Sequence, residues 1–214
     1  MEPHKTMPKT SKLVIIGDSA FAQVAYEYFT HDSAYEVVGF CVEQAFLKQT
    51  EMFGLPVVAF ETLEKHFTPN NHSFFAALVY TQLNRLRTRL YQAAKDKGFT
   101  PASFISSKAQ VWPNAKLGEH CFILENNVVQ PFVTLGNNVV LWSGNHIGHH
   151  SAIGDHCFIG VNATLVNNID LGDDCVIGAG ALVTKSLEPN SVVKGEAGEI
   201  ASNARRLHRV RDAS

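Results

Sequence analysis

The sequence predicts an α/β N-terminal domain of Rossmann type over residues 12–102, followed by an all-β, left-handed parallel β-helix over residues 103–195. Two observations support this order. Strand-like and helix-like segments alternate in the first half of the chain, and beyond them an aliphatic residue recurs with a period of six. A flexible N-terminus, residues 1–11, and a C-terminal tail with a short helix, residues 196–214, complete the expected organisation.

The first domain is expected to be a small parallel sheet with helices. The apolar run from Leu13 to Ile16 reads as a strand, Gly17 opens a tight turn, and Asp18 or Ser19 can cap the helix that follows. "YEVVGFCVE", "GLPVVAF" and "HSFFAALVY" are predicted to be further strands, whereas "ETLEKHF" and "NRLRTRLYQAAKDKGF" are predicted to be helices. Such alternation favours parallel βαβ units.

The β-helix is predicted from fourteen consecutive hexads that begin with aliphatic residues, from Ile105 to Val183. Three hexads, or 18 residues, then form one coil with three short faces, and each coil buries its aliphatic residues only when neighbours stack on it. The fifth position of each hexad is mostly small and is expected to point inward. Cys121, Cys157 and Cys175 occupy that position, which predicts core packing rather than metal or redox chemistry.

Composition excludes several classes of protein. The 214 residues carry a net charge of −2, which provides no field for binding nucleic acid or a membrane surface. No apolar run reaches the roughly 20 residues that a membrane span needs, and the polar N-terminus lacks the apolar core of a secretion signal. A cytoplasmic protein is therefore expected. The turn "GDSAFA" keeps only the first glycine of GxGxxG, which disfavours dinucleotide binding, although such a turn can still hold a phosphate or a ribose.

The stretch "HIGHHSAIG" carries a resemblance to a known family. It matches the aliphatic–x–His–x–Cys/Ser–x–Ile–Gly pattern around the catalytic histidine of the sialic acid O-acetyltransferases and bacterial nucleotide-aminosugar N-acetyltransferases, which are hexapeptide-repeat acyltransferases. The order of domains over roughly residues 12–195 is also similar to that family. The resemblance implies that His149 is the catalytic base. It further implies a homotrimer, acetyl-CoA bound between adjacent β-helices, and a nucleotide-linked amino sugar held partly by the N-terminal domain.

The same resemblance implies two further sets of site residues. The substrate-binding residues are expected where three strands of the first domain end: Gly17, Asp18, Ser19, Ala20, Glu43, Asn84 and Arg87. The residues expected to contact the coenzyme A arm are Asn145, Gly160, Gly178, Ala179 and Gly180. For Asn145 the alternative, an internal amide ladder with Asn127 one coil below, stays open.

Four histidines lie between residues 141 and 160, and such a cluster could be a metal site. His146 and His149 fall at outward positions along one edge, where His146 is expected to orient the acceptor beside the base. His120, His150 and His156 fall at the fourth position of their hexads, a corner that is expected to be solvated. Zinc needs three or four ligands converging at about 2 Å, whereas fourth-position residues on different faces diverge. No metal is therefore expected.

Together with these observations, the family resemblance implies an acetyl-CoA-dependent N-acetyltransferase that acts on a nucleotide-linked amino (dideoxy)sugar for surface polysaccharide or glycan synthesis. His149 would accept the proton as the amine attacks the thioester, in a direct ternary-complex reaction that needs no covalent intermediate. One alternative is O-acetylation of a sialic acid or another sugar hydroxyl. Alternatives from other classes are a non-catalytic trimeric scaffold and a zinc protein similar to the gamma carbonic anhydrases. The sequence leaves open the nucleotide base, the sugar and the length of the acyl chain.

Overall fold

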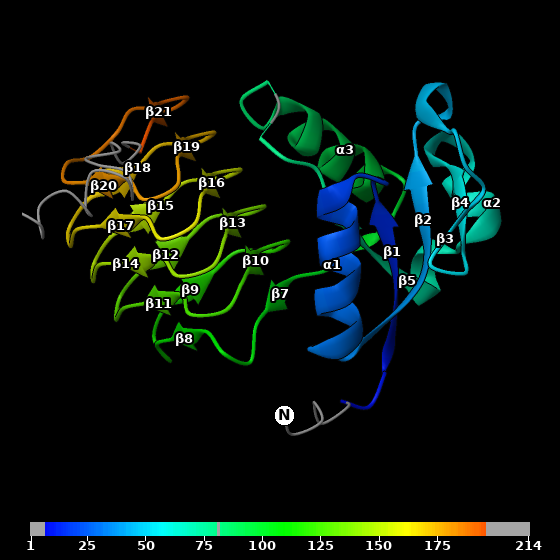
Figure 1. Cartoon of the computed structure of the whole chain (residues 1–214), viewed down its shortest axis with the longest axis horizontal. Helices are drawn as coiled ribbons and strands as arrows, with labels where there is room; N and C mark the ends of the chain where they lie inside the picture. Colours follow the sequence, from blue (N-terminus) through cyan, green and yellow to red (C-terminus); the bar gives the residue numbers. More distant parts are fainter. Residues whose placement is uncertain (1–6, 81, 196–214) are drawn as a thin grey trace, which may run out of the picture.

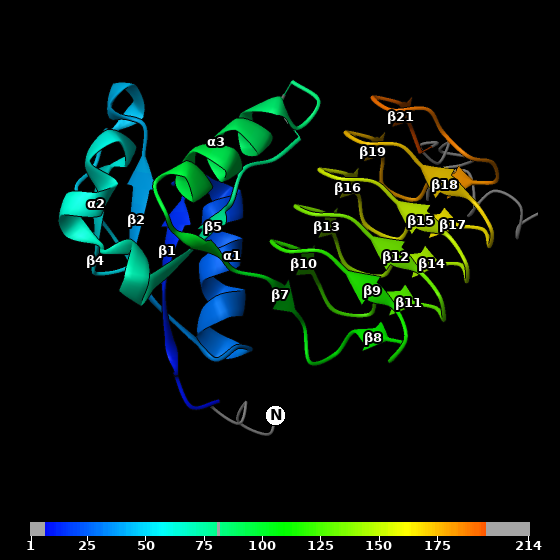
Figure 2. The ribbon, with the colours of Figure 1, turned by 180° about the vertical axis from the view of Figure 1, so that it is seen from behind.

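A computed structural model describes residues 7–80 and 82–195 of the chain. Two units lie side by side, an α/β domain and a stack of short coils (Figures 1 and 2). The predicted C-terminal tail, residues 196–214, lies outside the described part, as do the first six residues of the predicted N-terminal segment. The predicted fold class, an α/β domain followed by a parallel β-helix, is confirmed.

The α/β domain contains a six-stranded sheet in the order β3-β4-β2-β1-β5-β6. Its strands are parallel except at β3 and β4, which form an antiparallel edge. The elements in chain order are β1 (Ser11–Ile16), α1 (Ala20–His31), β2 (Tyr35–Val42), η1 (Gln44–Phe46), β3 (Glu51–Met52), β4 (Leu55–Ala59), η2 (Phe60–Thr62), α2 (Leu63–His66), η3 (Pro69–Asn71), β5 (His72–Ala76), α3 (Arg85–Asp96) and β6 (Thr100–Pro101).

Two predicted boundaries need correction. The strand predicted through Tyr80 ends at Ala76, because the chain leaves the sheet there and Val79 and Tyr80 become exposed beyond its edge. Ser19 does occupy the N-cap position of α1, but its side chain makes no capping hydrogen bond. The hydroxyl of Ser19 therefore does not cap the helix, although the sequence suggests that it could.

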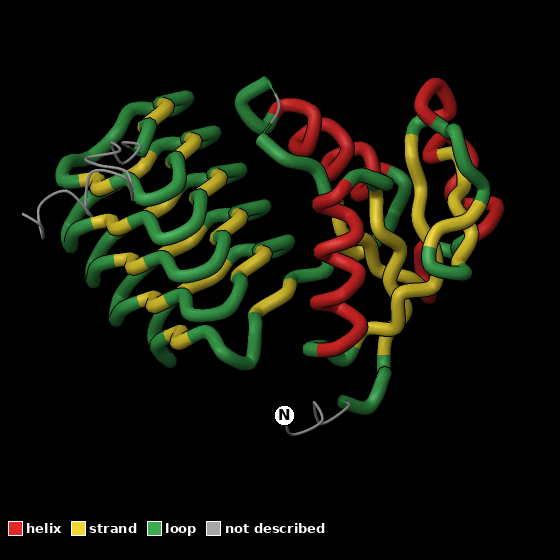
Figure 3. The backbone as a smooth tube through the Cα atoms, in the orientation of Figure 1, coloured by secondary structure: helices red, strands yellow, loops and turns green. Residues whose placement is uncertain are grey.

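The β-helix confirms the stacking that the period of six predicted. Each strand has two residues, and β10 pairs with β7 below and β13 above, 18 residues away in each direction. Figure 3 shows these strands as columns that run up the coils. The strands are β7 (Phe104–Ile105), β8 (Gln110–Val111), β9 (Lys116–Leu117), β10 (Phe122–Ile123), β11 (Val128–Val129), β12 (Thr134–Leu135), β13 (Val140–Leu141), β14 (His146–Ile147), β15 (Ala152–Ile153), β16 (Phe158–Ile159), β17 (Thr164–Leu165), β18 (Asp170–Leu171), β19 (Val176–Ile177), β20 (Leu182–Val183) and β21 (Val192–Val193).

The strands form three faces. The first face contains β7, β10, β13, β16, β19 and β21, the second β8, β11, β14, β17 and β20, and the third β9, β12, β15 and β18. The first residue of each later hexad fills the interior, as in Ile123 and Ile159, and the three cysteines of the fifth position are fully buried beside them, as predicted. The core of this unit is therefore a continuous column of aliphatic and small side chains.

The fourth position of the hexads explains why histidines recur in this chain. Non-glycine residues there commonly have φ between 54° and 64°, in the left-handed region, and His120, His150 and His156 are three of them. Asn, Asp and His are enriched in this conformation because their short polar side chains tolerate it better than most. Three histidines are thus placed by a requirement of the backbone rather than by a metal.

The α/β domain packs on the first face through the sixth position of the hexads. Phe104, Phe122 and Phe158 are buried there together with the rings of Phe29 and Phe75. Phe122 and Phe75 lie with their ring centroids 4.8 Å apart. The sixth position of a hexad is expected to face outward. In every third hexad it is apolar, which indicates that another part of the protein covers this face.

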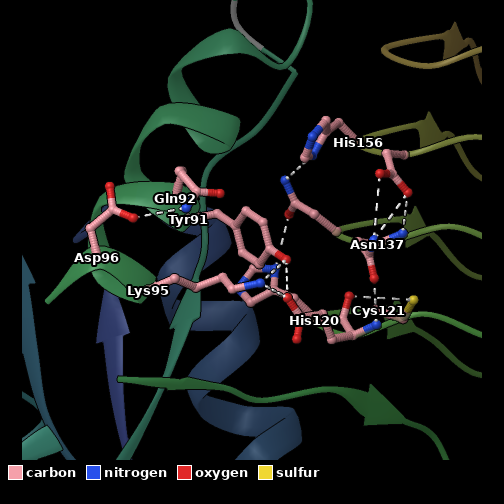
Figure 4. Close-up of polar contacts among 11 residues, drawn as sticks. Tyr91, Gln92, Lys95, Asp96, His120, Cys121, Asn137 and His156 are labelled. Carbon is pink, nitrogen blue, oxygen red and sulfur yellow. Dashed lines mark hydrogen bonds and ion pairs between the residues drawn. The ribbon is translucent and has the colours of Figure 1, made fainter. Parts of the chain in front are cut away.

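Polar contacts beside this apolar one fix α3 to the coils. Figure 4 shows Tyr91 and Lys95 of α3 beside His120, and Arg87, one turn earlier on the same helix, makes another such contact. The side chain of Arg87 is fully buried, and its Nη2 donates to the carbonyl oxygens of Asn138 (3.1 Å), His156 (2.7 Å) and Cys157 (3.3 Å). Burial lowers the pKa of this guanidinium to about 10, so it remains charged at neutral pH. One positive charge therefore joins the helix to the main chain of two coils.

His120 corrects the prediction of a solvated corner, because the α/β domain covers it. The backbone N–H of Ala76 donates to His120 Nε2 at 2.8 Å, so the proton of the ring lies on Nδ1. This Nδ1 lies 2.9 Å from Asn138 Oδ1, and Asn138 Nδ2 lies 3.0 Å from His156 Nδ1. In this chain of hydrogen bonds each group donates to the next: Ala76 N–H to His120, His120 to Asn138, and Asn138 to His156. Because His120 Nε2 accepts a hydrogen bond, the ring of His120 must be neutral. Burial, and then the charge of Arg87, lower its pKa to about 3.

We expect acid to weaken the contact between the domains through His120. Its folded pKa of about 3 lies below the unfolded value near 6.5, so the unfolded chain binds the proton first and stability falls as pH drops below about 6.5. The loss between pH 7.5 and pH 5.0 should be about 2 kcal/mol. Burial also lowers the pKa of His156, which acts in the same direction.

The measurement is urea unfolding from pH 5.0 to 7.5. His120→Asn keeps a residue suited to the left-handed turn but removes the ring, and it should be less stable at pH 7.5 with a flatter pH dependence. The matched control, His66→Asn, removes an exposed histidine of α2 and should stay within about 0.5 kcal/mol of the wild type at pH 7.5. An unchanged pH slope in His120→Asn would contradict this assignment.

Candidate functional site

The predicted catalytic histidines lie on the second face and at the corner beyond it. His146 stands exposed on β14, and His149 is half-buried in the turn that leads to β15. Gln130, one coil below, connects them: the backbone N–H of His149 donates to its Oε1 at 2.9 Å, and its Nε2 lies 2.9 Å from His146 Nε2. The sequence analysis missed Gln130, which occupies the second position of a hexad, where outward residues carry no distinguishing pattern.

The orientation of the Gln130 amide follows from its partners. A backbone N–H can only donate, so the atom that faces His149 must be the amide oxygen. The amide nitrogen then faces His146 and donates to its Nε2, which leaves the proton of the neutral His146 ring on Nδ1. One side chain thus fixes both the main chain at His149 and the tautomer of His146.

His149 also contacts its neighbour in the chain. Its Nδ1 lies 3.0 Å from His150 Nδ1, with the two rings nearly perpendicular at 88°. The ring of His150 stacks in turn on Phe132, with centroids 4.5 Å apart and planes inclined by 28°. No described residue bonds to His149 Nε2, so this nitrogen is open to a substrate proton.

A groove of about 480 Å³ lies on the first face beside the α/β domain. Three residues predicted to contact coenzyme A line it: Gly160, Gly178 and Ala179. Gly180, also predicted, is not among the lining residues. The walls include three aromatic side chains that the sequence analysis did not assign to the site: Tyr80, Trp142 and Phe158. Small residues and aromatic side chains make the lining of the groove largely apolar, with Lys194 as its charged member.

The first turn of the α/β domain adjoins this groove. Residues Gly17 to Ala20 lead into α1, and the next residue, Phe21, packs on Trp142 with ring centroids 5.4 Å apart. The N-terminus of α1 is therefore next to the groove wall, where its unpaired N–H groups favour negative charge. This predicted substrate-binding turn is thus joined to the groove wall through Phe21, although none of its four residues lines the groove.

The other predicted substrate-binding residues have protein partners or lie fully buried. Glu43 accepts two hydrogen bonds from Arg89, at 2.9 and 2.8 Å, and the first cause of its lowered pKa is this pairing. Arg87 joins α3 to the coils, as described above. Asn84 is fully buried in a left-handed conformation at the N-cap of α3, and its side-chain atoms have no hydrogen-bond partner among the described residues.

Asn145 lies inside the β-helix rather than in the groove. It is 1% exposed, its Nδ2 donates to the carbonyl of Trp142, and its Oδ1 accepts from the backbone N–H of Ala163 at 2.7 Å. Asn127, one coil below, also donates to the carbonyl of Trp142, at 2.9 Å. The two amides are therefore linked through this carbonyl, so the contacts of Asn145 are those of an internal amide ladder with Asn127.

The histidine edge and the groove belong to different faces of the same chain. The groove lies on the first face, toward the α/β domain, whereas β14 and the turn after it lie on the side away from that domain (Figure 1). One chain therefore does not bring His149 to the groove.

Within residues 7–80 and 82–195, no three His, Cys, Asp or Glu side chains are grouped so that they could hold a metal ion. The helices of this described part are also too short or too polar to cross a membrane.

Sequence and structure comparisons identify the repeat. The profile described as bacterial transferase hexapeptide (six repeats) matches residues 103–149, and the hexapeptide repeat of succinyl-transferase matches residues 152–185. The coils are thus hexapeptide repeats of the transferase type. A comparison with curated proteins found no match to this chain.

Solved structures share the whole architecture. The acetyltransferase domain of PglB from Neisseria gonorrhoeae FA1090 is 22% identical, with a TM-score of 0.69 over 87% of this chain and 97% of that one. A mutant of perosamine N-acetyltransferase from Caulobacter crescentus, in complex with CoA and GDP-perosamine, is 23% identical, with a TM-score of 0.68 over 90% of this chain and 98% of that one. WeeI from Acinetobacter baumannii AYE is 18% identical, with a TM-score of 0.55 over 90% and 93%. At these identities the likeness establishes a common fold.

Proposed function

We propose that this protein, whose coils are hexapeptide repeats of the transferase type, is an acetyl-CoA-dependent N-acetyltransferase that acts on a nucleotide-linked amino sugar. The observation that carries the proposal is the position of the first turn of the α/β domain. It leads into Phe21, which packs on Trp142 in the wall of the groove that Gly160, Gly178 and Ala179 line. The structures with similar folds include an N-acetyltransferase in complex with CoA and a nucleotide-linked amino sugar. The co-substrate is consistent with a cytoplasmic reaction.

The groove suits the arm of coenzyme A. Its volume of about 480 Å³ lies within the range of ordinary small-molecule sites, about 300–1,000 Å³. Gly160, Gly178 and Ala179 leave the floor open to an extended chain, and the aromatic walls offer it apolar contacts. The N-terminus of α1 beside it is suited to the phosphates of the second substrate.

His149 is the proposed base. The amine of the sugar attacks the thioester carbonyl, the C–N bond forms, and His149 Nε2 accepts the amine proton. When the tetrahedral species collapses, the C–S bond breaks and the proton passes to the departing thiolate. The backbone N–H groups at the coil corners are candidates for stabilising the oxyanion. His146 is exposed and is held by Gln130 through Nε2, and it is the proposed group that orients the acceptor through Nδ1–H.

A second copy of the chain is proposed to complete the site. Because His149 and the groove lie on different faces, a neighbouring β-helix must supply one of them. A homotrimer with three such junctions would bring the second face of each copy against the groove of the next. Exposed apolar side chains on and beside the second face, including Trp112 (56% exposed) and Leu182 (63%), support its burial in an assembly.

The test is release of free thiol from acetyl-CoA over a panel of nucleotide-linked amino sugars, with the matched hydroxyl sugars and free sialic acid as alternative acceptors. We expect turnover with an amino sugar and formation of an amide, identified by mass spectrometry. Turnover only with hydroxyl acceptors would replace this proposal with O-acetylation. Absence of turnover together with absence of acetyl-CoA binding in calorimetry would favour a non-catalytic scaffold.

A further inference from the structure

The corner that carries His149 contains a second histidine whose placement is as closely fixed as that of the base. We propose that His150 is the positioning residue of His149: its Nδ1 accepts the Nδ1 proton of His149, so that Nε2 of His149 carries the lone pair that takes the acceptor proton. This inference rests on the proposed acyl transfer. It concerns a residue that lies at an exposed corner, as the hexad pattern predicts, and that also has defined partners there.

The geometry allows only one proton between the two rings. The two Nδ1 atoms lie 3.0 Å apart, so one of them donates and the other accepts. If His150 donated, the neutral ring of His149 would carry its proton on Nε2 and could not act as a base there. If His149 donates, its Nε2 has a free lone pair. Only the second arrangement serves the proposed reaction.

His150 is held in place from below. Its ring stacks on Phe132, which sits at the same corner one coil earlier, and its own N–H donates to the carbonyl of Pro131 at 3.2 Å. Phe132 is itself anchored, since its N–H donates to Asn114 Oδ1 at 3.1 Å. Stacking on an aromatic ring fixes the plane of the imidazole and hence the direction of its Nδ1 lone pair.

The base is held from the other side by Gln130, whose Oε1 accepts the N–H of His149 at 2.9 Å. The main chain of His149 and its ring are therefore both constrained, by two different side chains. When Nε2 accepts the proton of the attacking amine, His149 becomes an imidazolium, and its Nδ1–H bond to the neutral His150 becomes charge-assisted. His150 keeps its own proton throughout, and the transferred proton leaves with the thiol.

The test compares three substitutions at the left-handed corner, all of which tolerate that backbone conformation. His150→Gly removes the acceptor, and we expect kcat to fall about 10- to 100-fold with KM for acetyl-CoA within twofold. This is less than the roughly 10⁴-fold loss seen when a carboxylate partner of a catalytic histidine is replaced, because a neutral ring is a weaker partner. His150→Asn and His150→Asp supply an oxygen acceptor and should recover most of kcat. The matched control is Asn168→Gly, one coil above with φ of 58°, which should keep wild-type kcat.

A second readout does not depend on activity. In protein labelled with ¹⁵N-histidine, the wild type should show His149 protonated on Nδ1 and unprotonated on Nε2, and His150→Gly should show a mixture of tautomers. A wild-type His149 that is protonated on Nε2, or a His150→Gly variant with kcat within twofold of the wild type, would overturn the inference. If the wild type transfers no acyl group at all, the proposed function fails, whereas the tautomer measurement still decides the hydrogen bond.

Discussion

Replacement of His149 by alanine is expected to lower kcat for acyl transfer by about 10²- to 10⁴-fold, the usual contribution of a general base. The amine of the acceptor must lose a proton as it attacks. His149 Nε2, which no described hydrogen bond occupies, is the atom proposed to accept it. KM for acetyl-CoA should change little, because the groove lies on another face. The measurement is initial-rate thiol release at saturating acetyl-CoA, with His66→Ala as an exposed histidine control that keeps wild-type turnover.

The same variant tests whether the site lies between copies. Ala179→Trp fills the groove with a bulky ring at an exposed position of its floor, and it should be inactive by itself. Co-expression of His149→Ala with Ala179→Trp should recover part of the activity, because a mixed assembly contains junctions in which an intact His149 meets an intact groove. The absence of recovery, with mixed assemblies verified by two different affinity tags, would contradict a site shared between copies.

Arg87→Met is expected to destabilise the protein by about 3–5 kcal/mol, the range for breaking a buried charged contact. The guanidinium is fully buried, and its loss leaves the carbonyl oxygens of Asn138 and His156 without that donor where α3 meets the coils. Methionine retains the length and apolar stem of arginine, so the change isolates the polar contact. The thermal midpoint should fall by about 10 °C for a chain of this size.

The control for this prediction is Arg85→Met, two residues earlier on the same helix and exposed, which should change stability by less than about 0.5 kcal/mol. Thermal unfolding followed by circular dichroism measures both variants. A variant of Arg87 that keeps the wild-type midpoint but raises KM for the sugar nucleotide would instead support the substrate-binding role that the family resemblance implies for this residue.

Part of the candidate site could be predicted because the hexad period assigns a position to each residue. Gly160, Gly178 and Ala179 lie at small positions near one corner, and the structure places them in the groove. Gln130 and His150 could not be assigned in this way. Their contacts with His149 depend on residues one coil apart and on side-chain directions at a corner, which the period does not encode.

The interface between the two domains could not be predicted from the period of six either. The period places Phe122 and Phe158 at outward positions and His120 at a corner, yet all three are buried. The apolar character of the sixth position in every third hexad indicates that this face is covered, but it does not indicate by what.

The repeat of six alone sets the coils, their stacking and the inward side chains, because an aliphatic residue at that spacing can be buried only if successive coils are superposed. The alternating pattern before it likewise requires parallel strands and covering helices. Contacts between segments far apart in the chain decide which face receives the α/β domain. They also decide which histidine becomes buried and neutral, and which one keeps an open ring nitrogen as the proposed base. Such contacts change the environment of a side chain without changing its place in the repeat. Three histidines at the same hexad position therefore have three different surroundings: His120 is buried between the domains, His156 lies at the edge of that interface, and His150 lies against the proposed base.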